Sequence, residues 1–400
     1  MRVQQKKKLA LVLSGGGVKA AAFHIGVVLA LREKGFKFSG GFHRDPGFKF
    51  EGKEMTFTLY VGSSAGSVIS SFLASGYSVD AIVDAFTKGA GFASSRPLDS
   101  HENTLSPITY KDIFSLNIQS AHPSTLLSKL FKERPTLTGG VETLLKKAFK
   151  VNGLFSTKNL EKYLREKVLT NNDFHALSAE LYIVATQLNH SRKVVFGPYE
   201  ETKKTKEIMY ANFANISESA AASASLPPFF SPTPITLPNG TEHYFFDGEI
   251  RDTLSTHVAA DQGADLVISS YSIQPYHYTK EMGSLHEYGM PIIFNQALYQ
   301  LVQQKIERHI KHQKDMRSMI KAAQGYLREA KVGEEQIDKL TEILVQRTNL
   351  NPNVDYIYIH PSPSDYQFFF ADHFSLNPKV LERLVKAGFR AAMTALRPLV

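Results

Sequence analysis

The first regular segment of the chain has the sequence LALVLSGGGVKA at residues 9–20. Five apolar residues are followed at once by a serine and three glycines, which is the pattern of a buried strand that enters a tight turn. The small and apolar residues from 18 to 34 predict a helix after that turn, ended by Gly35. A strand, a glycine turn and a helix in this order are typical of the start of an α/β domain.

The same order recurs further along the chain. Residues 57–61 predict a second strand, GSSAG follows at 62–66, and a helix is expected to about residue 75. Residues 36–54, between the two units, predict a surface loop or hairpin. Further strands are predicted at 181–186, 244–246, 266–271 and 354–359. Strands that alternate with helices indicate an α/β sandwich around a mostly parallel sheet.

The chain divides into two parts by the character of its sequence. Residues 1–290 are predicted to form the α/β domain, in which the irregular segment 91–150 is either a cap or lid over a site or a decorative insertion. Residues 291–400 predict a mainly helical C-terminal extension that packs on this domain. Its long helical stretches lie at 293–324, 334–347 and 378–399.

The composition is that of a folded globular protein, with 400 residues, 43% hydrophobic and 21% charged. Cysteine is absent, which excludes disulfides, thiolate metal sites and a cysteine nucleophile. The formal net charge of +8 favours an anionic partner, either nucleic acid or acidic lipid head groups. No nucleic-acid-binding motif accompanies this charge, so we expect no nucleic-acid partner.

The N-terminus resembles a signal peptide, because a basic stretch at 6–8 precedes the apolar run. That run has only five residues before the glycines, whereas a signal peptide needs roughly 7–15 apolar residues. No segment approaches the ~20 apolar residues of a membrane-spanning helix. We therefore expect a cytoplasmic or peripheral membrane protein, with secretion by a route without a signal peptide left open.

The glycine turn at 15–17 is predicted to bind an anion. Glycine lets a ligand approach the main chain, and the N–H groups at a helix start attract negative charge. Gly15, Gly17 and Ala20 formally fit the dinucleotide fingerprint, but the next strand ends in GSSAG and lacks the required acidic residue. A P-loop would need Gly-Lys-Ser/Thr, which is missing. An oxyanion hole formed by the N–H groups of Gly16 and Gly17 remains as the third interpretation.

The second turn contains Gly62, Ser64 and Gly66 in the spacing G-x-S-x-G, between a predicted strand and a predicted helix. This is the context of a nucleophile elbow, in which a sharp turn raises a reactive serine above the sheet. An ordinary strand-to-helix turn rich in glycine and serine is the alternative. The glycine turn upstream, which can supply oxyanion donors, favours the elbow.

Together these motifs resemble the patatin-like phospholipase family. The resemblance continues through GLFSTKNL at 153–160, SASLPPFF at 223–230 and Asp247-Gly248, in the family's order, over about residues 8–275. It implies a patatin-like three-layer α/β/α sandwich and a phospholipase A-type lipid acyl hydrolase. It also implies a serine–aspartate dyad that forms an acyl-enzyme without histidine, metal or cofactor, and a phospholipid or other acyl lipid as substrate.

Matched position by position, the resemblance implies Ser64 as nucleophile and Asp247 as general base. It implies an oxyanion hole from Gly15, Gly16 and Gly17. It further implies supporting roles for Lys19, Gly62, Gly66 and Gly248. No metal-ligating group of residues stands out in the sequence.

The sequence departs from the family pattern most clearly at Glu249, where a small residue is usual. A second carboxylate beside Asp247 raises the pKa of one of the two, so Glu249 either improves the base or weakens the site. The second possibility leaves open a lipid- or protein-binding module with a weakened site. Ala20 and the stretch RDTL at 251–254 are milder departures.

A Ser-His-Asp esterase of the α/β-hydrolase type is a further alternative, because several histidines follow Asp247. His360 is the best placed, since it follows a predicted strand. The others are His257, His286 and His373, whereas His24 is expected to pack in the core.

Cations recur at near-helical spacing between residues 301 and 321. They form either a solvated helix face or a surface for anionic membranes, to which each cation contributes on the order of 1 kcal/mol. They are Lys305, Arg308, Lys311, Lys314, Arg317 and Lys321. The sequence does not indicate whether the protein is a monomer or an oligomer.

Overall fold

The computed structural model describes residues 3–42, 54–88, 104–117, 153–251, 253–348 and 353–397. Its centre is a sheet with the strand order β13-β12-β1-β3-β6-β7-β9-β8. Neighbouring strands from β13 to β6 are parallel. Their bounds are β13 Asp355–Ile359, β12 Leu266–Ser270, β1 Leu9–Leu13, β3 Thr56–Ser63 and β6 Glu180–Gln187. The predicted mostly parallel sheet is confirmed.

The remaining strands extend this sheet in mixed directions. Antiparallel pairing joins β7 to β6, β8 to β9, β11 to β6 and β10 to β11, whereas β9 runs parallel to β7. Their bounds are β7 Arg192–Phe196, β8 Lys203–Lys204, β9 Ile208–Ala211, β10 Thr233–Thr236 and β11 Glu242–Asp247. One further strand, β2 (Lys37–Phe38), pairs parallel with β3 inside the segment expected to be a loop or hairpin.

Helices cover both faces of the sheet. Alternate residues of each strand point to opposite faces, and apolar side chains on both faces need to be covered. Leu9, Leu11 and Leu13 of β1 belong to the core that includes α1 (Gly17–Glu33), α2 (Ala65–Ala74) and α13 (Pro378–Ala395). Ala10 and Val12 pack on the other side with α9 (Thr256–Asp261). Burial on both faces explains why the strand is apolar at every position.

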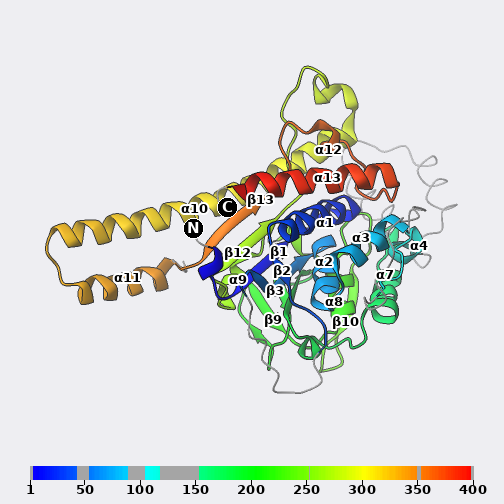
Figure 1. Ribbon diagram of the computed structural model, residues 1–400. Helices are drawn as coiled ribbons and strands as arrows, with labels where there is room; N and C mark the ends of the chain where they lie inside the picture. Colours follow the sequence, from blue (N-terminus) through cyan, green and yellow to red (C-terminus); the bar gives the residue numbers. More distant parts are fainter. Residues whose placement is uncertain are drawn as a thin grey trace, which may run out of the picture.

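The C-terminal part of the chain is joined closely to this sandwich. It supplies β13 to the sheet, and α13 lies alongside α1 (Figure 1). The two helices approach closely at two glycines. A Cβ on Gly26 would lie 2.0 Å from the carbonyl oxygen of Val385, and one on Gly388 would lie 2.0 Å from that of Phe23. The boundary at 290/291 stays a prediction. The segment 91–150, interpreted as either a cap or lid or a decorative insertion, lies outside the described residues except for 104–117.

Two helices project from the body as a hairpin, α10 (Met290–Glu329) and α11 (Glu334–Thr348) (Figure 1). α10 has 40 residues, and both helices were expected from the sequence with shorter bounds for α10. Within the described ranges, none of the helices is both long enough and apolar enough to cross a membrane.

Candidate active site

Ser64 lies in a sharp turn between β3 and α2. Its backbone has φ 51° and ψ −124°, a conformation that costs a non-glycine residue on the order of 1–3 kcal/mol. A Cβ on Gly62 would lie 2.4 Å from Ser67 Cα, and one on Gly66 would lie 2.1 Å from the carbonyl oxygen of Leu13. The close packing of this turn leaves no room for side chains at either position.

Ser64 and Asp247 meet because their strands share one edge of β6. β7 pairs with one edge of β6, and β3 and β11 both pair with the opposite edge. β3 ends with Ser63 opposite Val184, and β11, which runs the other way, ends with Asp247 opposite Ala185. The two strands therefore end head to head, and Ser64 is the first residue beyond β3.

Asp247 is buried, and its carboxylate accepts a hydrogen bond from the backbone. The N–H of Glu249 donates to Oδ1 at 2.9 Å. Burial raises the pKa of Asp247 to about 6, and this backbone hydrogen bond and the neighbouring Ser64 side chain oppose the rise. A carboxylate with this pKa is nearly as basic as an imidazole, whose ordinary pKa is about 6.5.

The C-terminal end of α8 (Ile216–Ser223) holds both members of this pair. The Ser223 hydroxyl accepts the N–H of Ser64 at 2.7 Å and donates to the carbonyl of Val184 at 2.5 Å. Two residues later, the carbonyl of Ser225 accepts the N–H of Asp247 at 3.1 Å. The strained serine turn is therefore tied to β6 through one side chain.

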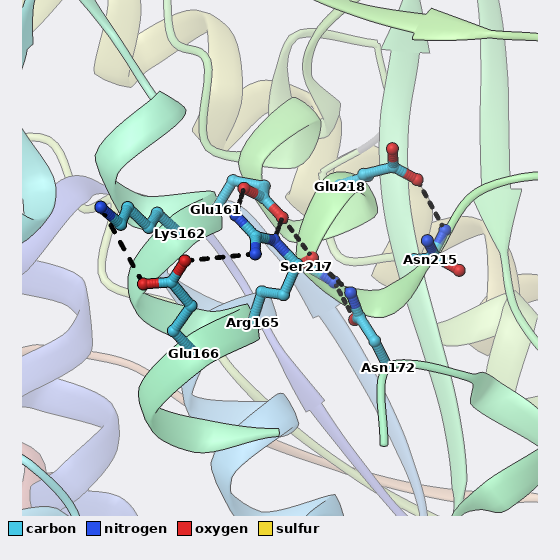
Figure 2. Close-up of polar contacts among 8 residues, drawn as sticks. All are labelled: Glu161, Lys162, Arg165, Glu166, Asn172, Asn215, Ser217 and Glu218. Carbon is cyan, nitrogen blue, oxygen red and sulfur yellow. Dashed lines mark hydrogen bonds and ion pairs between the residues drawn. The ribbon is translucent and has the colours of Figure 1, made fainter. Parts of the chain in front are cut away.

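The N-terminal end of α8 is anchored by a polar network beside α7 (Lys158–Tyr163) (Figure 2). Asn215 and Glu218 form a capping box at the start of α8. The Ser217 hydroxyl donates to the Glu161 carboxylate at 2.8 Å and accepts from Asn172 Nδ2 at 2.7 Å. Both ends of the helix that carries Ser223 are thereby fixed.

The glycine loop lies beside Ser64, at the start of α1. Gly16 and Gly17 have φ of 132° and 70°, a region that favours glycine. The N–H of Gly15 donates to Oε1 of Glu249 at 2.9 Å. The Glu249 carboxylate thus bonds the glycine loop, while the backbone N–H of the same residue bonds Asp247.

An apolar cavity opens beside Ser64 and the start of α1. Its lining is almost entirely aliphatic and aromatic, which suits an acyl chain. The lining includes Val68, Phe86, Ile108, Leu160, Phe230 and Phe374.

A family model for the patatin-like phospholipases matches residues 11–260. The chain belongs to this family. A comparison with curated proteins gave no match. Membership places the chain among lipid acyl hydrolases, and the match covers the end of β1, the glycine loop, the Ser64 turn and Asp247.

Lys19 does not point toward the serine of this patatin-like site. It is buried, and its Nζ donates to the carbonyl of Phe369 at 3.1 Å and lies 4.6 Å from the ring centre of Phe368. Burial lowers the pKa of Lys19 to about 7, and the charge of Asp365 opposes this change. The family's basic loop residue is therefore bonded here to the C-terminal part of the chain.

His360, the best placed of the histidines predicted for a triad, lies away from Ser64. His360 stacks on Tyr271 with ring centres 5.0 Å apart, and it lines a separate cavity. It follows β13, three strands from β3, and strands lie about 4.8 Å apart. His360 is thus far beyond hydrogen-bond reach of Ser64. His24 is buried, as expected, and bonds Ser14 and Ser270.

Two features of the site were missed from the sequence. Ser223 was noted only as part of a family motif, and its bond to the Ser64 N–H had no sequence signal. Phe374 and His373 lie more than a hundred residues beyond the end of the family match, yet they reach the glycine loop. A tertiary contact of this kind leaves no periodicity or spacing in a single sequence.

Proposed function

We propose that the chain is a phospholipase A-type lipid acyl hydrolase with Ser64 as nucleophile and Asp247 as general base. The observation that carries the proposal is the meeting of Ser64 and Asp247 at the facing ends of β3 and β11 on one edge of β6, with Ser64 lining an apolar cavity. The raised pKa of Asp247 supports it, because a base works best with a pKa near the working pH.

In the proposed reaction, the Ser64 oxygen attacks the ester carbonyl carbon while its proton passes to Asp247. The tetrahedral intermediate collapses as Asp247 returns that proton to the departing alcohol oxygen. Water then attacks the acyl-enzyme, giving one proton to Asp247, which passes it back to Ser64 as the fatty acid leaves. Each step balances with Asp247 alone carrying the proton.

The oxyanion is proposed to bind at the glycine loop. Gly15 already donates its N–H to Glu249, so Gly16 and Gly17 are the amides left to receive the developing negative charge. Both lie at the start of α1, where unpaired N–H groups and the helix dipole favour an anion. Removal of one such donor typically reduces kcat by about 10²–10³.

The substrate is proposed to be a phospholipid or other acyl lipid taken from a peripheral anionic membrane surface. Along α10 the large apolar side chains of Met290, Phe294 and Leu301 are 80%, 64% and 58% exposed. They precede the cations at 305–321, although Arg317 donates to the carbonyl of Val354 in the body. Both features suit contact with lipid head groups and acyl chains.

The proposal is tested with Ser64→Ala and, as a matched control, Ser70→Ala, a buried serine further along α2. Ser64→Ala should reduce hydrolysis of phospholipid and soluble ester by at least 10³ and abolish labelling by a fluorophosphonate. Ser70→Ala should keep both the hydrolysis and the fluorophosphonate labelling. Hydrolysis by Ser64→Ala within tenfold of the natural protein would disprove the dyad, and an inert natural protein that still binds lipid would favour the binding-module alternative.

A further inference from the structure

The segment 373–376 lies directly on the glycine loop, although the family match ends at residue 260. The carbonyl of His373 accepts the N–H of Lys19 at 3.1 Å. A Cβ on Gly17 would lie 2.6 Å from that carbonyl oxygen and 3.3 Å from Cε1 of Phe374. The Phe374 ring therefore packs against the loop that we propose binds the oxyanion.

Phe374 is held between two anchors. On one side, the His373 ring donates from Nδ1 to the carbonyl of Gly16 at 3.4 Å and accepts the Tyr299 hydroxyl at Nε2 at 3.0 Å. Burial lowers the pKa of His373 to about 4, so the ring is neutral, as this donor and acceptor pattern requires. On the other side, the N–H of Leu376 donates to the Tyr110 hydroxyl at 2.7 Å.

The position of Phe374 in the cavity follows from burial. Val68, Phe86, Ile108 and Leu160 are all buried and form the inner end. Phe374 is only partly buried, and its ring centre lies 5.2 Å from that of Phe229, which is 43% exposed. Phe374 therefore lines the outer end.

Other phenylalanines hold the ring in place. Phe114 lies 5.5 Å and Phe230 lies 6.1 Å from Phe374 between ring centres. Aromatic pairs at these distances attract one another beyond the effect of their burial. The outer end of the cavity is consequently bordered by a packed aromatic ring that the C-terminal part of the chain supplies.

We propose that Phe374 is a specificity-determining residue that limits the width of the alcohol part of the ester, an inference that rests on the proposed function above. With the acyl chain along the inner end and its carbonyl at Ser64, the alcohol part faces Phe374. A glycerol without a second chain fits beside the ring, whereas one that carries a second acyl chain must displace it. Phe374 therefore favours one-chain lysophospholipids over two-chain phospholipids.

The test measures kcat/KM for a one-chain and a two-chain phosphatidylcholine that share the same acyl chain, both in detergent micelles. Phe374→Ala should raise the ratio of two-chain to one-chain turnover by about tenfold or more, since changes of one methylene in an apolar pocket alter discrimination 10–200-fold. Phe374→Trp should lower the same ratio. The opposite signs separate a specificity effect from a general loss of stability.

Phe370→Ala is the matched control, because Phe370 lies four residues before Phe374 but packs on Tyr276 and Tyr288 away from the cavity. It should leave the ratio unchanged. A ratio within twofold of the natural one in both Phe374 variants, or an equal change in Phe370→Ala, would overturn the inference. If Ser64→Ala still hydrolysed both lipids, the proposed function would fail instead, which keeps the two failures distinct.

Discussion

Replacing Asp247 by Asn should inactivate the enzyme and stabilise its fold at neutral pH. An Asn side chain keeps an oxygen to accept the Glu249 N–H, and its amide can donate to Ser64, so the local geometry is preserved. It cannot take a proton from Ser64, so ester hydrolysis should fall by at least 10³. Loss of activity would identify Asp247 as the base. The stability change tests whether burial raises the pKa of its carboxyl.

The size of the stability change follows from the pKa. Burial raises the pKa of Asp247 from 3.8 to about 6, and one pKa unit corresponds to 1.36 kcal/mol. Because the folded pKa lies above the unfolded one, keeping this carboxylate ionised at pH 7 costs the folded state about 3 kcal/mol. Asp247→Asn removes that cost, so the free energy of unfolding should rise by as much as about 3 kcal/mol at pH 7.

The same reasoning fixes the pH dependence. Near pH 4 the folded carboxyl is protonated, and the stability gain of Asp247→Asn should nearly vanish. In the natural protein, kcat/KM should fall about tenfold per pH unit below pH 6, because the protonated acid cannot accept the Ser64 proton. At pH 5 about a tenth of the plateau rate should remain, whereas an unshifted carboxyl would leave almost all of it.

Denaturant unfolding at pH 7 and pH 4 measures the stability difference, and a pH-stat measures the rate. Glu218→Gln is a suitable control, since that carboxylate caps α8 at the surface, away from the dyad. An Asp247→Asn protein that is equally or less stable at pH 7 would refute the burial argument. Hydrolysis by this variant within tenfold of the natural rate would refute the base assignment.

Three other changes test separate parts of the proposal. His360→Ala should leave ester hydrolysis within twofold of the natural rate, and a loss as severe as that of Ser64→Ala, with normal folding, would establish the triad. Glu249→Gln keeps an oxygen for the Gly15 N–H but removes a charge near the developing oxyanion, so kcat should rise about threefold to tenfold; a decrease would show that this carboxylate is needed. Binding to vesicles should rise with anionic lipid and fall with salt, and Gln at Lys311, Lys314 and Arg317 should remove most of that dependence, whereas binding indifferent to lipid charge would make these cations a solvated helix face.

The sequence predicted the elements well where local patterns determine them. The apolar run at 9–13 and the alternating run at 354–359 both became strands with nearly the expected bounds, because burial and strand periodicity are written into neighbouring residues. The two glycine-containing turns could be located for the same reason: their conformations and close contacts exclude side chains.

The sequence could not predict contacts that depend on how distant segments meet. Lys19 was expected to support the glycine loop, yet its side chain is bonded to the C-terminal segment through the carbonyl of Phe369. Glu249 was predicted to place a second carboxylate beside Asp247, and the hydrogen bond from the N–H of Gly15 to this carboxylate could not be foreseen. In both cases the residue type was informative, but the direction of a long side chain is set by tertiary packing.

In the proposed mechanism, burial of the aspartate replaces the histidine of other serine hydrolases. An exposed aspartate has a pKa near 3.9 and is too weak a base to accept a serine proton efficiently at neutral pH. Here β11 carries Asp247 to a buried edge of the sheet, where its pKa of about 6 approaches that of imidazole. Burial thus gives a carboxylate the basicity for which other hydrolases use a histidine. It follows that a change which admits water to Asp247 should lower its pKa and reduce the rate at pH 7, even with both members of the dyad intact.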